Sequence, residues 1–200
     1  SLLKWSRLHV SKLRWQARVP KEYPDRDLII GLKKGSVVKV VGTKHTVGGL
    51  VMISQDGEKA YEFLLETNER ERWLDFDHGE LTLWGEWDDP DLWGELARKG
   101  KKPHPVMLQD IASIEKIDNL YVSPSSWSIS SKVETLWGRW GRNYPPYAKS
   151  KYNFVGLEVE NLTIDGRRLY ISLESSAGQK VLYDFYIGIE LKRKDVSLAE

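Results

Sequence analysis

The chain contains no cysteine among its 200 residues. This absence excludes disulfide frameworks, Cys-ligated zinc or iron–sulfur sites and thiol nucleophiles. Long apolar runs are also missing, because stretches such as Leu50–Ile53 are far shorter than the roughly 20 residues that a transmembrane helix needs. Neither sign of charge is in excess, because 30 Lys and Arg residues balance 29 Asp and Glu residues. A net charge of +1 gives no overall field that would favour nucleic acid or a membrane surface.

The first residues carry no sign of a secretory signal. Leu2 and Leu3 are followed at once by Lys4, Arg7 and Lys12, so no apolar segment of signal-peptide length begins there. We therefore expect a cytoplasmic location and no transmembrane segment in this chain.

Motifs for catalysis and metal binding are absent as well. The histidines occur singly, and no pair of them has the spacing of two metal ligands on one element. No Gly-x-Ser-x-Gly elbow and no Gly-rich phosphate loop is present. Asp75 and Asp77, next to His78, form the most metal-like cluster, but carboxylates at a solvated turn explain it without a ligand. We expect no catalytic residue, no metal, no cofactor and no enzymatic activity.

What the sequence does contain is a period of two, which is typical of β-strands. Apolar and polar residues alternate around Tyr61–Leu65 and Leu157–Ile164, among other segments. The dipeptides Asp56–Gly57, His78–Gly79 and Asp165–Gly166 lie between such segments, where hairpin turns are expected. The pattern predicts an all-β protein built from antiparallel strands.

One short helix is expected at Pro90–Lys99, capped by Asp88 or Asp89 and ended by Gly100. The following Lys101–Pro105 contains two prolines and can neither extend a helix nor join a central strand. We place a boundary there. The prediction is two small antiparallel β modules, barrel- or sandwich-like and either interlocked or in tandem: residues 1–100 with a basic first segment, and residues 105–200 with an aromatic loop.

Charge is segregated along the chain. Lys4–Glu22 holds six bases and one acid, whereas Glu58–Glu95 holds thirteen acids and three bases. The basic segment could lie against the acidic residues of its own chain. Alternatively it could face nucleic acid, with Trp5 and Trp15 stacking on bases.

An aromatic loop in the second half is the candidate binding site. Aromatic residues and arginine are enriched at the centres of interfaces, and loops often carry binding. The same rings could instead close the end of a β-barrel, and the sequence leaves both alternatives open. The candidate residues are Trp127, Trp137, Arg139, Trp140, Arg142, Tyr144 and Tyr147.

Three motifs resemble a bacterial and archaeal β-domain family of unknown function. They are Val38–Gly42, Tyr61–Glu66 and Arg72–Trp84, and the segments Ile171–Glu174 and Gln179–Gly188 are similar to the closing hairpin of that family. Members tend to be encoded near envelope-stress genes of the phage-shock-protein-A type. The resemblance implies an accessory or assembly role and supplies no catalytic residues.

Together these features predict a non-enzymatic binding or scaffold module that acts through protein–protein contacts. The resemblance adds an association with envelope stress or a membrane-associated assembly. The alternative is a nucleic-acid-binding module that uses the basic N-terminal arm and the aromatic loop.

Overall fold

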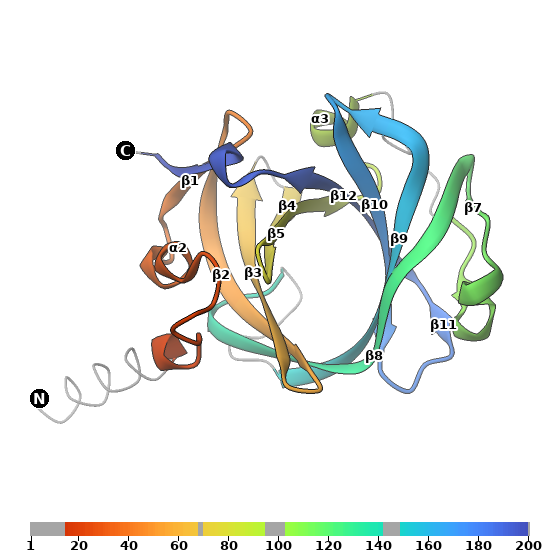
Figure 1. The fold of residues 1–200 in the computed structure, drawn as a ribbon, viewed down its shortest axis with the longest axis horizontal. Coiled ribbons are helices and arrows are strands. Elements are labelled where there is room, and N and C mark those ends of the chain that lie inside the picture. Colours follow the sequence, from red (N-terminus) through yellow and green to blue (C-terminus); the bar gives the residue numbers. More distant parts are fainter. Residues whose placement is uncertain (1–14, 68–69, 95–102, 142–148, 200) are drawn as a thin grey trace, which may run out of the picture.

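A computed structural model describes residues 15–67, 70–94, 103–141 and 149–199 (Figure 1). Residues 15–17 are helical, and the remaining elements follow in chain order. They are α2 (Arg26–Gly31), β1 (Val37–Val40), β2 (Thr43–Gln55), β3 (Glu58–Thr67), β4 (Arg70–Asp77), β5 (Glu80–Glu86), α3 (Pro90–Trp93), β6 (Val106–Met107), η2 (Leu108–Ser113), β7 (Lys116–Ile117), β8 (Leu120–Gly138), β9 (Lys149–Ile164), β10 (Arg167–Ser176), β11 (Val181–Leu182), β12 (Asp184–Leu191), η3 (Arg193–Asp195) and β13 (Val196–Leu198).

Eight antiparallel strands close into a barrel, which Figure 1 shows as a ring. Their order around the ring is β2, β3, β4, β5, β12, β10, β9 and β8, and the pairing of β2 with β8 closes it. Strands β1 and β13 extend the sheet beyond β2, and β7 extends it beyond β8. Strands make up 62% of the residues that the structure describes, so the predicted all-β class is confirmed.

Both predicted modules contribute strands to this single barrel. Strand β12, from the second half of the chain, pairs with β5 from the first half. At the other seam β8 pairs with β2. The predicted boundary at residues 101–105 therefore does not separate two barrels or sandwiches. Each half alone would leave two strand edges without hydrogen-bond partners, and closing one barrel removes these edges.

The predicted hairpin turns are confirmed. Asp56–Gly57, His78–Gly79 and Asp165–Gly166 connect β2 to β3, β4 to β5 and β9 to β10. All six residues have positive φ angles, as two-residue turns of the favoured twist require. The turn dipeptides therefore fix the register of three of the hairpins in the barrel.

The predicted helix begins at Pro90, as expected, and its helical residues end at Trp93. Asp89 caps it, because the side chain accepts hydrogen bonds from the backbone N–H groups of Asp91 and Leu92. The rest of the predicted range, residues 95–99, lies outside the described residues. Helix α2, which the sequence pattern did not predict, is only six residues long.

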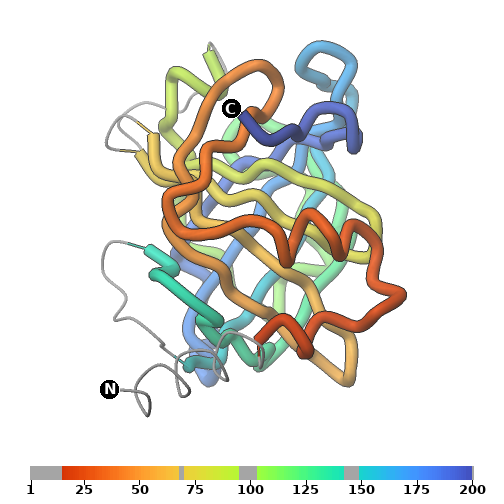
Figure 2. Tube along the Cα trace, turned by 90° about the vertical axis from the view of Figure 1, so that its left-hand side faces the viewer, coloured from red at the N-terminus to blue at the C-terminus, as the bar shows by residue number. Residues whose placement is uncertain are grey.

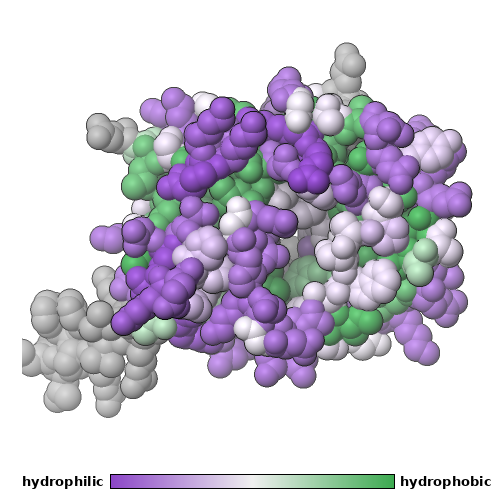
Figure 3. Space-filling view, viewed as in Figure 1, coloured by the Kyte–Doolittle hydropathy of each residue, from purple (hydrophilic) through white to green (hydrophobic). Residues whose placement is uncertain are grey.

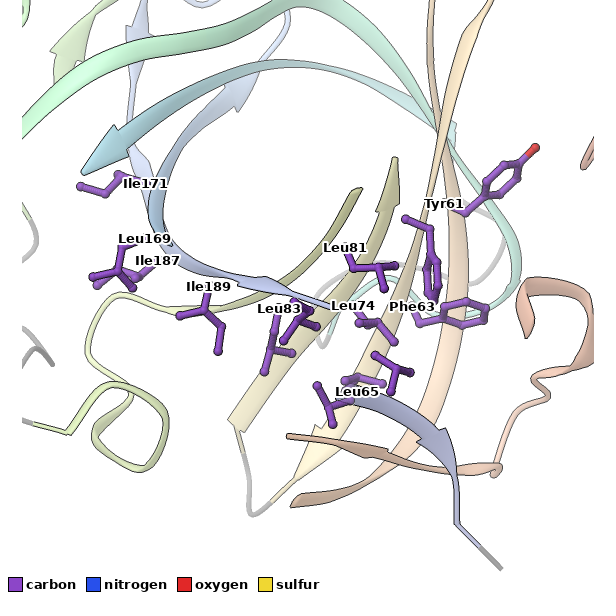
Figure 4. Close-up of a cluster of buried hydrophobic side chains, with 14 of the residues drawn as sticks. Tyr61, Phe63, Leu65, Leu74, Leu81, Leu83, Leu169, Ile171, Ile187 and Ile189 are labelled. Carbon is purple, nitrogen blue, oxygen red and sulfur yellow. The ribbon is translucent and has the colours of Figure 1, made fainter. Parts of the chain in front are cut away.

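The large aliphatic core lies on the outer face of the barrel. Figure 4 shows Leu169, Ile171 and Ile189 on the convex side of the curved strands. They belong to one buried cluster with residues of α2, β1, β13, η2 and β11, which therefore cover the barrel from outside. Figure 2 shows the segment around α2 running across the outside of the strands. The apolar faces of the strands are buried against this covering layer, and the opposite faces point into the barrel.

At the seam between β2 and β8 the two backbones approach closely. A Cβ atom on Gly49 would lie 1.8 Å from the carbonyl oxygen of Arg139, and Gly138 has a φ of +68°. No other residue type fits at Gly49 without moving the backbone of β8. The closure of the barrel thus depends on glycine at this crossing.

Candidate functional site

The interior of the barrel contains a cavity of about 700 Å³. Every one of the eight barrel strands contributes a side chain to its wall, and Figure 3 shows this face of the molecule hollowed at its centre. The lining residues are Ile53, Ala60, Glu62, Glu71, Trp73, Asp75, Asp77, Trp84, Glu86, Ser126, Ser128, Ser131, Trp140, Gly141, Tyr152, Phe154, Gly156, Ser172, Glu174, Asp184 and Tyr186. A volume of this size is in the range of small-molecule sites.

The period of two in the strands puts polar residues on the inner face. In β4, Trp73 and Asp75 line the cavity, whereas Leu74 and Phe76 belong to the outer core. Side chains of successive strand residues point to opposite faces, so an apolar outer face forces its polar neighbours inward. The barrel interior is therefore largely charged and aromatic, and most of the buried aliphatic residues lie outside.

Three carboxylates lie deep in the barrel. Glu62 on β3 is the direct cross-strand partner of Asp75 on β4, and Glu174 on β10 faces the same cavity. Directly opposite residues on neighbouring antiparallel strands have Cβ atoms about 5 Å apart. Each of the three side chains is half-buried, and its remaining accessible surface lines the cavity. The site thus holds several acidic groups at close range.

Burial raises the pKa of all three carboxyl groups, because an enclosed carboxylate loses its hydration. The pKa of Glu174 rises to about 8, with smaller raising contributions from Asp184 and Asp75. The negative charge of Glu174 adds to the rise for Glu62, and the charge of Glu62 adds to the rise for Asp75. Among the described residues no lysine, arginine or histidine forms an ion pair with any of the three. A pKa of about 8 favours the protonated forms of Glu62 and Glu174 near neutral pH.

Six aromatic rings also line the cavity. Trp73 meets Tyr186 edge to face, with centroids 5.2 Å apart, and Trp140 meets Tyr152 in the same way at 5.0 Å. The ring of Trp84 lies over Gly188, where a Cβ atom would approach its Cε3 to 2.7 Å. Near-perpendicular rings cannot form one flat stack, so they stand as separate walls around the space. Carboxylates and aromatic faces thus share one enclosure.

Trp140 helps to close this enclosure. It follows the end of β8, and only 8% of its surface is exposed. The indole of Trp73 donates a hydrogen bond to the backbone carbonyl of Trp140 over 3.1 Å, and the Trp140 side chain hydrogen-bonds to Glu62. Trp140 also belongs to the small inner apolar cluster with Val51 and Val133.

The predicted aromatic site is divided among different environments. Trp127 on β8 is 51% exposed. Trp137 is half-buried against the outer core, 6.1 Å from the ring of Phe63 and 6.2 Å from that of Trp15. Trp140 instead lines the interior. The structure therefore does not gather these three tryptophans into one surface patch.

Arg139, the predicted basic member of the site, pairs with acids of the barrel. Its Nε donates to Glu66 over 2.9 Å, and its Nη1 lies 3.5 Å from Glu71. The positive charge that was expected to meet a partner is thus compensated within the chain. The remaining predicted residues, Arg142, Tyr144 and Tyr147, lie outside the described residues.

Part of the basic N-terminal segment also pairs internally. Arg18 makes two hydrogen bonds to Glu134, at 2.9 Å and 2.6 Å. The sequence suggested a contact with the acidic Glu58–Glu95 stretch, but the partner of Arg18 is a residue of β8. Lys4, Arg7, Lys12 and Arg14 lie outside the described residues.

The inner carboxylates are functional candidates that the sequence analysis missed. The sequence pattern puts Asp75 in the most metal-like cluster and explains it by a solvated turn, but its side chain lines the barrel interior. A signal for this was present, because tryptophan and tyrosine share the polar faces with the acids, as in Trp73 with Asp75 and Tyr186 with Asp184. A strand face that carries both large rings and acids is better explained by an enclosed site than by bulk solvent.

Within the described parts of the chain, no group of three or more His, Asp or Glu side chains is arranged to hold a metal ion. In the same parts, no helix is long and apolar enough to span a lipid bilayer.

The raised pKa of Glu174 predicts that stability depends on pH. The folded protein keeps a proton that the unfolded chain loses above a pH of about 4.3, so stability falls as pH rises toward about 8. The carboxyl groups of Glu62, Asp75 and Asp184 face the carboxyl group of Glu174. The pKa values of Glu62 and Asp75 are also raised, so these two groups likewise make stability fall as the pH rises. Between pH 6.5 and 8.5 we expect the melting temperature of the protein to fall by about 3–6 °C.

The variant Glu174→Gln isolates this effect in thermal melts across that pH range. It should reduce the fall, because a neutral amide cannot ionise. The range begins at 6.5 because His45, whose pKa is lowered to about 4 by burial, makes stability fall on acidification below that pH. An unchanged pH dependence in Glu174→Gln would show that this carboxyl group does not hold its proton.

The chain matches no family of known proteins, no curated protein and no solved structure at a significant level. The candidate site is therefore argued from its own geometry.

Proposed function

We propose that this protein is a non-enzymatic binding protein that takes a small organic molecule into its barrel. The observation that carries the proposal is a cavity of about 700 Å³ to which all eight strands contribute side chains. A barrel of eight strands encloses just enough space for its own side chains or for one small ligand. Here the inward residues include four serines and Gly156, which leave room.

The test is a thermal-shift screen of small organic compounds against the wild-type protein and the variant Ser128→Trp. Ser128 lines the cavity on β8, so an indole there should fill part of the space. A compound that binds inside should raise the melting temperature of the wild type, as any ligand selective for the folded state does. It should have little effect on Ser128→Trp.

The matched control is Ser197→Trp, because Ser197 is exposed on β13 and does not line the cavity. This variant should respond to ligand as the wild type does. Mass spectrometry of the compound recovered after incubation checks the non-enzymatic part of the proposal. A protein that only binds its ligand leaves the mass of the compound unchanged. The proposal fails if no compound stabilises the wild type, or if Ser128→Trp responds equally.

A role in protein–protein contacts remains a second proposal, and one observation favours it. Trp127 and Ile129 are 51% and 55% exposed, and they point away from the cavity, because Ser126 and Ser128 on the same strand line it. Exposed large apolar residues often mark contact surfaces. The envelope-stress association rests on the family resemblance alone and stays a prediction, as does a cytoplasmic location. Loss of partner capture in Trp127→Ala, with unchanged stability, would support this second role.

Binding of nucleic acid remains the alternative from the sequence. The described residues favour it less, because Arg18 and Arg139 are already paired with carboxylates. Titration with oligonucleotides at two salt concentrations tests it, since neutralised phosphates impose a steep salt dependence.

A further inference from the structure

The charge of the cavity wall restricts what can bind there. Seven of the described lining residues are acidic. No lysine, arginine or histidine is among the described lining residues. Arginines outside the wall approach two of the acids: Arg139 lies 3.5 Å from Glu71, and Arg70 lies 3.4 Å from Glu86. The deep carboxylates described above have no such partner among the described residues. Once these acids ionise, they repel an anionic ligand, and only a cation compensates their charge.

The aromatic rings favour a positive ligand independently of the acids. The faces of Trp, Tyr and Phe rings are negative, and they attract a cation that lies within about 6 Å of the ring centroid. Three of the six rings are tryptophan, the residue that binds cations best in this way. The edge-to-face pairs around Trp73 and Trp140 place rings on different sides of one space. Such an arrangement suits an alkylated ammonium group, which has an apolar surface and a positive charge.

One polar group in the wall also lacks a partner. Ser131 on β8 is fully buried and lines the cavity, and its Oγ makes no hydrogen bond to any described residue. A buried hydroxyl without a partner is costly, so nearly all such groups in proteins are hydrogen-bonded. A polar atom of a bound molecule would satisfy it. Ser131 therefore adds a hydrogen-bonding group to the acids and rings of the wall.

We propose that the ligand of this cavity is an organic cation, an amine or quaternary ammonium compound of modest size. Its positive group would lie among Glu62, Asp75 and Glu174 and against the rings of Trp73 and Trp84, and its apolar part would fill the rest of the cavity. The assignment rests on the proposed function and names its ligand class. An inorganic cation is disfavoured, because the described residues offer no group of three or more metal ligands and a bare ion makes no use of the rings.

Three small probes of similar shape and different charge test the assignment. Benzyltrimethylammonium is the cation, neopentylbenzene is its neutral isostere and phenylacetate is an anion. Titrations at pH 8, followed by tryptophan fluorescence, should show binding of the cation at least tenfold tighter than that of the neutral isostere, and no binding of the anion. Affinity for the cation should fall as the pH is lowered to 5.5, because protons then compete for the carboxylates.

The outcomes separate the two proposals. If neopentylbenzene binds as tightly as the cation, the cavity binds ligands but the cationic assignment is wrong. If none of the probes binds and the compound screen also finds nothing, the proposed function itself fails. A further titration uses calcium chloride. Binding of calcium in preference to the ammonium probe would overturn the assignment of an organic cation as the ligand.

Charge-removing variants test which groups are responsible. Glu174→Gln and Asp75→Asn keep the shape of the side chains, and each should weaken binding of the cation at least tenfold without weakening that of the neutral isostere. Glu115→Gln is the matched control, because Glu115 is exposed and does not line the cavity. Circular dichroism checks that the variants fold. Unchanged affinity for the cation in both folded variants would overturn the assignment.

Discussion

Replacing Trp140 by alanine is expected to lower the free energy of unfolding by about 3–5 kcal/mol. Trp140 is only 8% exposed and packs edge to face on Tyr152 at a centroid distance of 5.0 Å. Truncation would remove this contact and the packing against Val51 and Val133, and it would open the end of the cavity. Denaturant unfolding of the purified variant measures the loss.

The matched control is Trp127→Ala, which removes the same atoms from a side chain that is 51% exposed. It should change stability by less than about 1 kcal/mol, as surface substitutions usually do. Equal losses in the two variants would contradict the placement of Trp140 inside the barrel. A negligible loss in Trp140→Ala would restore the interpretation of this residue as part of an external binding surface.

Asp89→Ala should be comparably destabilising, by about 3–5 kcal/mol. Asp89 is completely buried, and its two carboxylate oxygens accept hydrogen bonds from Nε and Nη2 of Arg72 at 2.9 Å and 3.3 Å. The same side chain caps α3 through the N–H groups of Asp91 and Leu92. Its removal would leave the guanidinium of Arg72 buried without a counter-charge. Thermal and urea unfolding would measure the loss.

The neighbouring Asp88 provides the comparison. Its side chain is exposed and pairs with Arg70 at the surface over 3.0 Å. Asp88→Ala should therefore cost less than about 1 kcal/mol, because solvent screens exposed ion pairs. A loss in Asp89→Ala as small as that in Asp88→Ala would mean that Arg72 reaches solvent or another acid once Asp89 is gone.

The strands and several turns follow from local sequence. In the hairpin around Asp165–Gly166 the turn residues and the alternation of Leu157 and Val159 with acidic neighbours were enough to predict two antiparallel strands. The cap at Asp89 and the start of α3 at Pro90 were predictable for the same reason. These features depend on residues close to one another in the chain, and their chemistry is independent of the rest of the fold.

The closure of the barrel could not be predicted in this way. It depends on β2 pairing with β8, where Leu50 is opposite Trp137, and on β5 pairing with β12. Neither pairing can be recognised in the local pattern of apolar, polar and turn residues. Two modules with open edges and one closed barrel have the same strands and the same turns, so the sequence predicted two modules, interlocked or in tandem, and not one barrel.

The direction of the strand faces was also ambiguous. Alternation shows that Leu74 and Phe76 share one face and Trp73 and Asp75 the other, but not which face is enclosed. A buried aliphatic face is normally assigned to the interior of a barrel. Here short elements such as α2 and β13 bury that face from outside, so the acidic face lines the cavity. The candidate site therefore became visible only in three dimensions.

The location of a bound cation is the most direct test of a carboxylate and aromatic site inside the barrel. Intermolecular nuclear Overhauser effects between the N-methyl protons of benzyltrimethylammonium and the protein would measure it. We expect contacts to the rings of Trp73, Trp84 and Tyr186, which line the cavity. Contacts confined to Trp127 or Tyr121, both exposed on the outside of the protein, would contradict a binding site in the barrel.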